Sequence, residues 1–195
     1  MHNCIFSNHC CETVCDKSCP ILTQTTYLLE RNNIDMQSNV FNTNPKRLHR
    51  FENIVDKSEG TFRCYMSNDT VNDAELLTYC SICKHWKASR LHCTVYNLKY
   101  SQYLDMIKQS WGSYSESSEL EYMKIWASTA KVLIVSNIDY VNFKDFECQT
   151  LLNLLQSRAS KEFTTIIVSP ETKYLVGNSR FFPALTNKLD GAVIR

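Results

Sequence analysis

The most constraining feature of this sequence is the apolar run in residues 131–139, which reads Lys-Val-Leu-Ile-Val-Ser-Asn-Ile-Asp. Its aliphatic part, residues 132–135, ends abruptly in Ser136 and Asn137. Continuous apolar runs of this length are typical of a strand that is covered on both faces, as the strands of parallel sheets are. Ligands of open α/β sheets bind beyond the carboxyl ends of the strands. We therefore expect a buried parallel strand whose end, at Ser136 and Asn137, lies at any ligand site.

The chain around this run alternates between strand patterns and helix patterns. We expect strands at residues 61–66, 91–97, 131–139, 164–169 and 191–194, separated by helices at residues 74–87, 100–111, 120–127 and 146–159. Such alternation predicts an α/β protein with a doubly wound, mainly parallel sheet of about five strands.

These patterns predict that the chain has three parts. Residues 1–34 are predicted to form a cysteine-rich metal-binding module and a helix that follows Pro20. Residues 35–60 are predicted to form a polar linker with a short basic amphipathic helix. Residues 61–195 are predicted to form the α/β domain.

The cysteines cluster at the start of the chain. Five of the ten lie in the first twenty residues, namely Cys4, Cys10, Cys11, Cys15 and Cys19. In a reducing compartment such clusters are better explained by a metal than by disulfides. We predict a structural Zn²⁺ site formed by Cys4, Cys10, Cys15 and Cys19, with Cys11 and His9 as substitutes. The irregular spacing also suits an iron–sulfur cluster, so both metals stay open. Either would fasten a segment too short to fold alone.

The remaining cysteines fall in segments that we expect to be core elements. They are Cys64, Cys80, Cys83, Cys93 and Cys148. Free cysteine often behaves as a small buried hydrophobe, which is the interpretation we favour for all five. Cys80 and Cys83 form a Cys-x-x-Cys pair, but no second pair is nearby in the sequence, so the signal for redox or metal chemistry there is weak.

Charge and hydropathy narrow the functional classes. The 21 basic and 20 acidic residues leave a net charge of +1, which gives no global signature of a nucleic-acid-binding protein. The sequence has no apolar run of about 18 residues. It also lacks the basic and then apolar pattern of a signal peptide. We therefore expect a cytoplasmic protein without a membrane partner.

Residues 61–74 predict a strand, a polar loop and a helix, which is the arrangement of a phosphate-binding loop. The polar segment reads Ser-Asn-Asp-Thr-Val-Asn-Asp over residues 67–73. It has no glycine to let the backbone approach a phosphate, and no Lys-Ser/Thr pair opens the helix at Ala74. Asp73 lies at the position where a phosphate-binding loop has a lysine. Its negative charge would repel the phosphates of a nucleotide, which the lysine would attract. We therefore expect no bound nucleotide.

The order and spacing of these elements resemble the AAA+ ATPase core without its lid domain, in particular helicase loaders of the DnaC/DnaI type. The resemblance covers residues 61–195 and rests on pattern more than on signature residues. It maps the Walker A loop of that family onto Ser67 to Ala74, where Asn72 and Asp73 also stand at degenerate phosphate-loop positions.

The resemblance maps the Walker B motif onto Ser136 and Asn137, which replace the two acidic residues of that motif. The family has a helix ending in Arg before the strand that carries sensor 1, and the helix ending at Arg158 is similar. The family's sensor 1 Asn is absent here, where the chain reads Ser-Pro-Glu over residues 169–171. Residues 182–189 are similar to the segment before the last strand. Such loaders also carry a cysteine-rich N-terminal metal module that grips the helicase.

These departures suggest a pseudo-ATPase with no catalytic residues. If so, Mg²⁺ would have no carboxylate and the phosphates no cation. Asp139 could replace a Walker B acid, although a carboxylate beyond a strand end more often caps the next element. The expected role is a non-hydrolysing AAA+-like subunit that makes protein–protein contacts in a DNA replication or mobile-element complex. It would load or regulate a replicative helicase, or accompany an active AAA+ subunit, with DNA contact left open.

Three other hypotheses stay open. One is a nucleic-acid-binding subunit that combines aromatic stacking with the basic residues Lys46, Arg47, Arg50, Lys84, Lys87 and Arg90. For the basic residues of the 45–57 helix, a solvated helix face is the interpretation that we favour. The second hypothesis is an iron–sulfur accessory protein. The third is an α/β scaffold of unrelated ancestry.

Overall fold

The computed structural model describes residues 20–34, 38, 40, 43–87, 94–112, 117–138, 144–170 and 193–194. Its elements in chain order are α1 Pro20–Arg31, α2 Pro45–Lys57, β1 Phe62–Met66, α3 Thr70–Lys87, β2 Val95–Lys99, α4 Tyr100–Ser110, α5 Ser118–Thr129, β3 Val132–Ser136, α6 Asp145–Ala159, β4 Thr164–Ser169 and β5 Val193–Ile194. Several predicted features lie outside the described residues: the metal ligands Cys4, Cys10, Cys15 and Cys19, their substitutes, Asp139, and the segment at 182–189.

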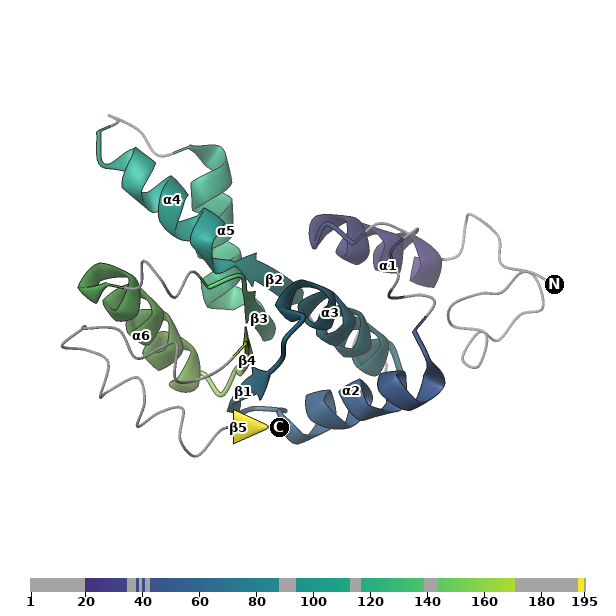
Figure 1. Ribbon diagram of the computed structural model, residues 1–195. Helices are drawn as coiled ribbons and strands as arrows, with labels where there is room; N and C mark the ends of the chain where they lie inside the picture. Colours follow the sequence, from purple (N-terminus) through teal and green to yellow (C-terminus); the bar gives the residue numbers. More distant parts are fainter. Residues whose placement is uncertain are drawn as a thin grey trace.

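The strands form one five-stranded sheet in the order β2-β3-β4-β1-β5 (Figure 1). Every neighbouring pair is parallel. Parallel neighbours need crossover connections, and helices supply them here between β1 and β2, between β2 and β3, and between β3 and β4. The predicted α/β class with a parallel sheet of about five strands is thus confirmed.

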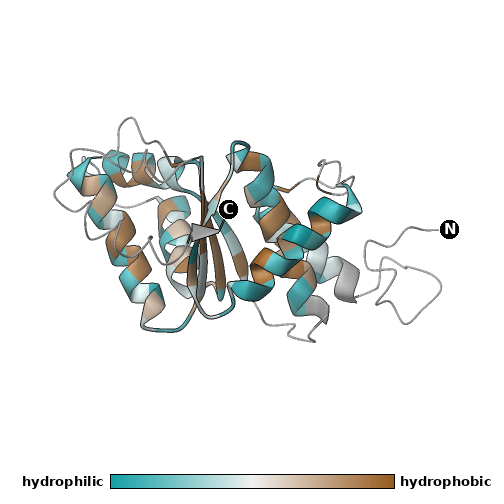
Figure 2. Cartoon of the chain, turned by 60° about the horizontal axis from the view of Figure 1, so that its bottom comes forward, coloured by the Kyte–Doolittle hydropathy of each residue, from teal (hydrophilic) through white to brown (hydrophobic). Residues whose placement is uncertain are grey.

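Two hydrophobic cores lie on opposite faces of the sheet, as alternation along β3 shows. Val132 and Ile134 pack in one core with residues of α1, α2 and α3, whereas Leu133 and Val135 pack in the other with residues of α4, α5 and α6. All five residues of β3 are buried, which confirms the buried strand predicted from the apolar run. Figure 2 shows the apolar strands between the two helical layers.

Helices α1 and α2 belong to the first of these cores. Leu29 of α1 and Phe51 of α2 are almost fully buried in it, and the Phe51 ring meets the Tyr65 ring of β1 edge to face at 5.3 Å. The helices predicted for the N-terminal module and the linker therefore pack directly against the sheet.

Ion pairs fasten α2 along α3 at both ends. Near the start of both helices, Arg47 Nη2 lies 2.5 Å from Asp73 Oδ1. Near their ends, Lys84 Nζ lies 3.0 Å from Asp56 Oδ1 and 3.0 Å from a carboxylate oxygen of Glu59. The two helices therefore run in the same direction. The boundaries of α2 match the prediction because Pro45 suits the first turn and the Asn44 side chain accepts a hydrogen bond from the Lys46 N–H at 2.9 Å.

The C-terminal end of α1 covers the free edge of β2. The side-chain amide of Asn32 donates to the Val95 carbonyl at 3.1 Å, and its oxygen accepts the Asn97 N–H at 2.6 Å. Arg31 lies beside α5, where its guanidinium carbon is 3.6 Å from the ring centroid of Trp126. Its Nε also donates to the Tyr122 hydroxyl. Exposed sheet edges can pair with other chains, so this contact protects the edge.

Some predicted boundaries were wrong. Helix α3 begins at Thr70, four residues before the predicted Ala74, because most of the polar segment predicted as a loop is helical. Strand β2 continues to Lys99, two residues past the predicted end at Asn97. Strand β3 ends at Ser136, before the predicted end at residue 139. The next residue, Asn137, has a left-handed backbone with φ of 52°.

Arg158, which the resemblance places at the end of a helix, has a structural role. Its side chain is fully buried. It donates hydrogen bonds to the Thr165 hydroxyl at 2.8 Å and to the carbonyls of Ala127 and Thr164 at 2.9 and 2.8 Å. Burial lowers the pKa of the Arg158 guanidinium to about 10, which leaves it charged at neutral pH. It therefore joins the end of α6 to α5 and β4.

Among the described residues, we find no helix with both the length and the apolar composition needed to span a bilayer.

Candidate functional site

The candidate site lies at the carboxyl ends of β1, β4 and β3, which are adjacent in the sheet. From its carboxyl end, β1 leads into α3 on one face, whereas β3 leads toward α6 on the other. Such a change of face is the usual ligand-binding position of an open α/β sheet. The two positions singled out in the sequence, Ser67 after β1 and Ser136 at the end of β3, are thus separated by one strand.

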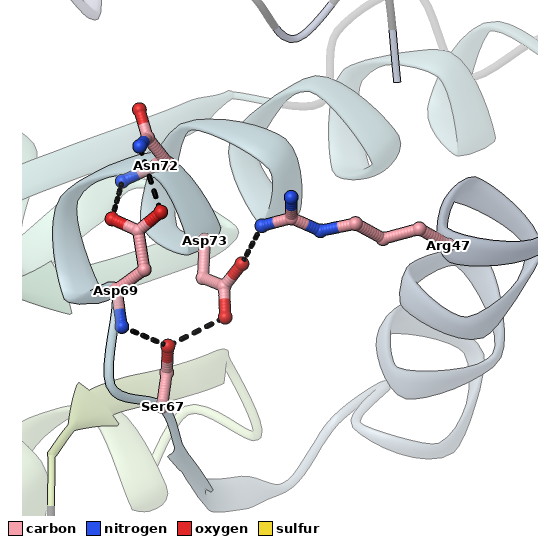
Figure 3. A network of polar contacts seen from close by, with 5 residues as sticks. All are labelled: Arg47, Ser67, Asp69, Asn72 and Asp73. Carbon is pink, nitrogen blue, oxygen red and sulfur yellow. Dashed lines mark hydrogen bonds and ion pairs between the residues drawn. The ribbon is translucent and has the colours of Figure 1, made fainter. Parts of the chain in front are cut away.

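The turn between β1 and α3 is short and is filled by its own side chains (Figure 3). Only residues 67–69 separate the two elements. The Ser67 hydroxyl donates to Asp73 Oδ2 at 2.6 Å and accepts the Asp69 N–H at 2.9 Å. The Ser67 and Asp73 residues are both more than nine-tenths buried. The predicted phosphate-loop positions Asn72, Asp73 and Ala74 therefore lie in the first turns of a helix and not in a loop.

Asp69 occupies the start of α3. Its carboxylate accepts the Asn72 side-chain amide at 2.7 Å and the Asn72 backbone N–H at 3.4 Å. Its carbonyl accepts the Asp73 N–H at 3.0 Å. The first N–H groups of a helix are those that bind a phosphate in nucleotide-binding proteins. Here a carboxylate of the chain already lies beside them.

A cation reaches the site from α2. The Arg47 side chain is about half exposed, at 47%, whereas the Asp73 side chain that it meets is only 8% exposed. Tyr65 of β1 lies near the same carboxylate. Burial raises the pKa of the Tyr65 hydroxyl and the Asp73 charge raises it further, while Arg50 and Arg47 oppose this change. Tyr65 is therefore neutral, and the positive charge at this site neutralises Asp73.

The end of β3 is also satisfied internally. The Ser136 hydroxyl donates to Asn97 Oδ1 of β2 at 2.8 Å. The Asn137 amide donates to the Ser101 hydroxyl at 2.8 Å, and the Asn137 carbonyl accepts the Ser101 N–H at 3.1 Å. Residues 132–138 and 164–170 contain no acidic side chain. The end of β3 thus offers neutral hydrogen-bonding groups that are used to hold β2 and α4.

These two positions have little capacity for phosphate chemistry. A phosphate at the β1–α3 turn would lie near the carboxylates of Asp69 and Asp73, and the Arg47 guanidinium that reaches this turn is already paired with Asp73. Proteins bind Mg²⁺ mainly through carboxylates and phosphates. The polar side chains described at this edge are engaged in hydrogen bonds within the chain and in the Arg47–Asp73 ion pair.

Sequence inspection identified Ser67, Asp73, Ser136 and Asn137 but missed their partners. Arg47 and Asp73 are 26 residues apart, and Asn97 and Ser136 are 39 apart. Neither partner carries a motif, since Arg47 stands among other basic residues of α2 and Asn97 lies in an apolar strand. Only the packing of α2 on α3 and of β2 on β3 brings them together.

Within the described ranges, no three His, Cys, Asp or Glu side chains are arranged to hold a metal ion. Four cysteines there, Cys64, Cys80, Cys83 and Cys148, are buried and form no disulfide. Burial raises the pKa of the Cys64 thiol to about 12. The interpretation of these cysteines as small core residues is therefore confirmed, whereas Cys93 lies outside the described residues.

The basic residues named in the nucleic-acid-binding hypothesis have different surroundings in the structure. Arg47 and Lys84 are held in the ion pairs between α2 and α3. Lys46 and Arg50 are exposed on α2. The Lys87 side chain and Arg90 lie outside the described residues.

Comparison with models of known protein families and with curated proteins finds no match to this sequence. What the fold and the site define is a parallel α/β protein with helices on both faces and a β1–α3 turn closed by its own carboxylates.

Proposed function

We propose that this protein is a non-hydrolysing, AAA+-like subunit that acts through protein–protein contacts in a DNA replication or mobile-element complex. In the sharpest form of this proposal it loads or regulates a replicative helicase, alone or beside an active AAA+ subunit. The observation that carries the proposal is the closed β1–α3 turn, in which Ser67, Asp69 and Asp73 form hydrogen bonds within the chain at the position that the resemblance gives to a phosphate-binding loop.

The energetics of this turn disfavour a nucleotide. Binding of a triphosphate would break the hydrogen bond from Ser67 to Asp73 and the ion pair from Arg47. The buried Asp73 carboxylate would then lose the Ser67 and Arg47 contacts and face the phosphate charge. Leaving a buried charged group unpaired costs several kcal/mol, roughly 3 or more. We expect no nucleotide binding at cellular concentrations.

The arrangement of the strands supports the AAA+-like part of the proposal. The resemblance assigns Walker A, sensor 1 and Walker B to the ends of β1, β4 and β3, and these three strands are neighbours in the sheet. Met66 pairs in register with Ser169, so the first two positions lie side by side. An α/β framework whose ligand edge is internally satisfied is suited to presenting surfaces to a partner.

Nucleotide binding tests the first half of the proposal. Equilibrium dialysis with radiolabelled ATP and Mg²⁺ is expected to show no binding up to millimolar ATP, beside an active AAA+ ATPase as a positive control. A dissociation constant in the micromolar range would overturn the pseudo-ATPase proposal. Circular dichroism of the same sample confirms that the protein is folded.

Association with a purified replicative helicase tests the second half. Size-exclusion chromatography with light scattering is expected to show a stable complex whose affinity is the same with and without ATP. Failure to associate at micromolar concentrations would remove the helicase from the proposal. A requirement for ATP bound to this chain would contradict the pseudo-ATPase proposal as well.

We also propose that Cys4, Cys10, Cys15 and Cys19 bind one structural Zn²⁺. Elemental analysis of purified protein is expected to give one zinc per chain and a colourless sample. Replacing Cys4 and Cys15 by serine should remove the zinc, whereas Cys80→Ser, in the core of α3, should leave it. A brown sample that absorbs near about 400 nm would instead identify an iron–sulfur cluster.

A further inference from the structure

A row of polar and basic side chains runs along the outer surface of α2. Lys46, Arg50, Asn53 and Lys57 follow one another at intervals of four, three and four residues, so they lie along one line of the helix. All four are exposed. With a rise of 1.5 Å per residue the row is about 16 Å long. We name these four residues the α2 stripe.

The acidic residues of α2 do not neutralise this row. Asp56 lies off the line and pairs with Lys84 of α3. Glu52 also lies off the line, with a carboxylate oxygen 3.8 Å from His49 Nδ1. Within the part of the chain that the structure describes, no member of the α2 stripe takes part in an ion pair. The stripe is therefore a local concentration of positive charge on a chain whose total charge is near zero.

The helix that carries the stripe is held firmly. Its core-facing side buries Phe51, Ile54 and Val55, and ion pairs with α3 hold both of its ends. Figure 1 shows α2 lying alongside α3 beside the sheet. The three cations are thus presented at fixed spacing, so little conformational entropy of the backbone is lost when they meet a partner.

We propose that the α2 stripe binds the phosphate backbone of a nucleic acid without reading its sequence. A nucleic acid is a linear polyanion, and Lys and Arg side chains at regular spacing neutralise its phosphates with release of counterions. Asn53 can add a hydrogen bond to a phosphate or a sugar, as amide side chains do. The stripe contains no aromatic ring, so base stacking is not part of this contact.

The apolar side of α2 argues against a membrane surface as the partner. Interfacial helices bind lipid by inserting their apolar face, whereas the apolar face of α2 is already buried in the core. No member of the α2 stripe forms a contact of the β1–α3 turn shown in Figure 3, although the Arg50 charge acts on the neighbouring Tyr65 hydroxyl. Oligonucleotide binding is therefore measured without ATP, so that its result and the ATP-binding result are obtained separately.

The experiment measures binding by fluorescence anisotropy with a labelled single-stranded oligonucleotide and with its duplex, between about 50 and 200 mM salt. The test variant is Lys46→Gln/Arg50→Gln. The matched control is Lys131→Gln/Lys161→Gln, which removes the same charge from two exposed lysines that precede β3 and β4. Thermal melting establishes that both variants fold, and Lys57→Gln serves as a second test variant at the other end of the stripe.

Salt-dependent binding by the natural chain is the expected result. The test variant should bind about tenfold more weakly, with a salt slope smaller by about one to two, because one phosphate contact contributes nearly one. The control variant should bind like the natural chain. The proposal is overturned if the natural chain does not bind at the lowest salt, or if both double variants lose affinity equally. It is also overturned if polyglutamate or anionic lipid vesicles bind as tightly as the oligonucleotide.

Discussion

Asn32 and Asn97 are 65 residues apart in the sequence, yet the Asn32 side-chain oxygen accepts the Asn97 backbone N–H at 2.6 Å. The same amide donates to the Val95 carbonyl. Strand β2 is at the edge of the sheet, so a side chain here makes the two hydrogen bonds that a further strand would make. The end of α1 thereby closes the edge to other chains.

Replacing Asn32 by leucine should destabilise the protein and open this edge. The Val95 carbonyl and the Asn97 N–H would lose their partners, and a buried polar group left unsatisfied costs about 1–3 kcal/mol. Urea unfolding should show this loss, and light scattering should show association that increases with protein concentration. Asn153→Ala removes an exposed amide from α6 and serves as the control. An unchanged urea midpoint would contradict the assigned role of Asn32.

Replacing Arg158 by methionine should be among the most destabilising substitutions. The guanidinium donates to the Ala127 and Thr164 carbonyls and the Thr165 hydroxyl in the interior, so its loss removes three buried hydrogen bonds and is expected to cost about 3 kcal/mol or more. Arg158→Lys should recover only part of this, because an ammonium lacks the planar fork of the guanidinium. Urea unfolding measures both. Equal stability of the natural and methionine forms would refute the structural role.

The ion pair between Arg47 and Asp73 can be measured by a double-mutant cycle with Arg47→Ala and Asp73→Asn. We expect a coupling free energy of about 1 kcal/mol. This coupling free energy is at the upper end of the range for surface ion pairs because Asp73 is buried. It is not larger because Arg47 is about half exposed. The coupling should fall at high salt, since the exposed cation is screened. Lys161→Ala with Asp73→Asn is a non-contacting control cycle, and an equal coupling there would contradict the pairing.

Stability should depend on pH through Glu147. Burial opposes ionisation of this carboxyl, but hydrogen bonds and charge from Lys108, whose Nζ lies 2.7 Å away, together with backbone N–H groups outweigh it and lower the pKa below 4.5. A carboxyl whose pKa is lower in the folded state stabilises the protein at pH values above its pKa in the unfolded state. This contribution is lost as the pH falls through its pKa in the folded state.

The corresponding comparison is between the natural chain and Glu147→Gln, from pH 7 down to pH 3. The natural chain should be more stable near neutral pH, and its advantage should shrink below about pH 4.5. Lys108→Met should remove most of the same advantage. A difference between the natural chain and Glu147→Gln that does not vary with pH would contradict the assignment.

Local patterns in the sequence account for most of the framework. The apolar run at β3 indicated a strand covered on both faces because every one of its residues needed an apolar environment, and it is fully buried. The bounds of α2 could be predicted because Asn44 and Pro45 are start signals that act within one turn. The start of α3 was missed because Asp69 caps it from a segment whose polar composition is equally typical of a loop.

The sequence by itself indicated a parallel α/β protein, a buried strand at β3, and polar residues, Ser136 and Asn137, at the carboxyl end of that strand. Only the tertiary structure decided what those polar ends do. Arg47 meets Asp73, Asn97 meets Ser136 and Asn32 closes β2, all through contacts between distant segments. The physical reason is that hydrophobic periodicity is a local property that fixes the type of each element, whereas the partners of a polar side chain depend on the order of strands and the packing of helices.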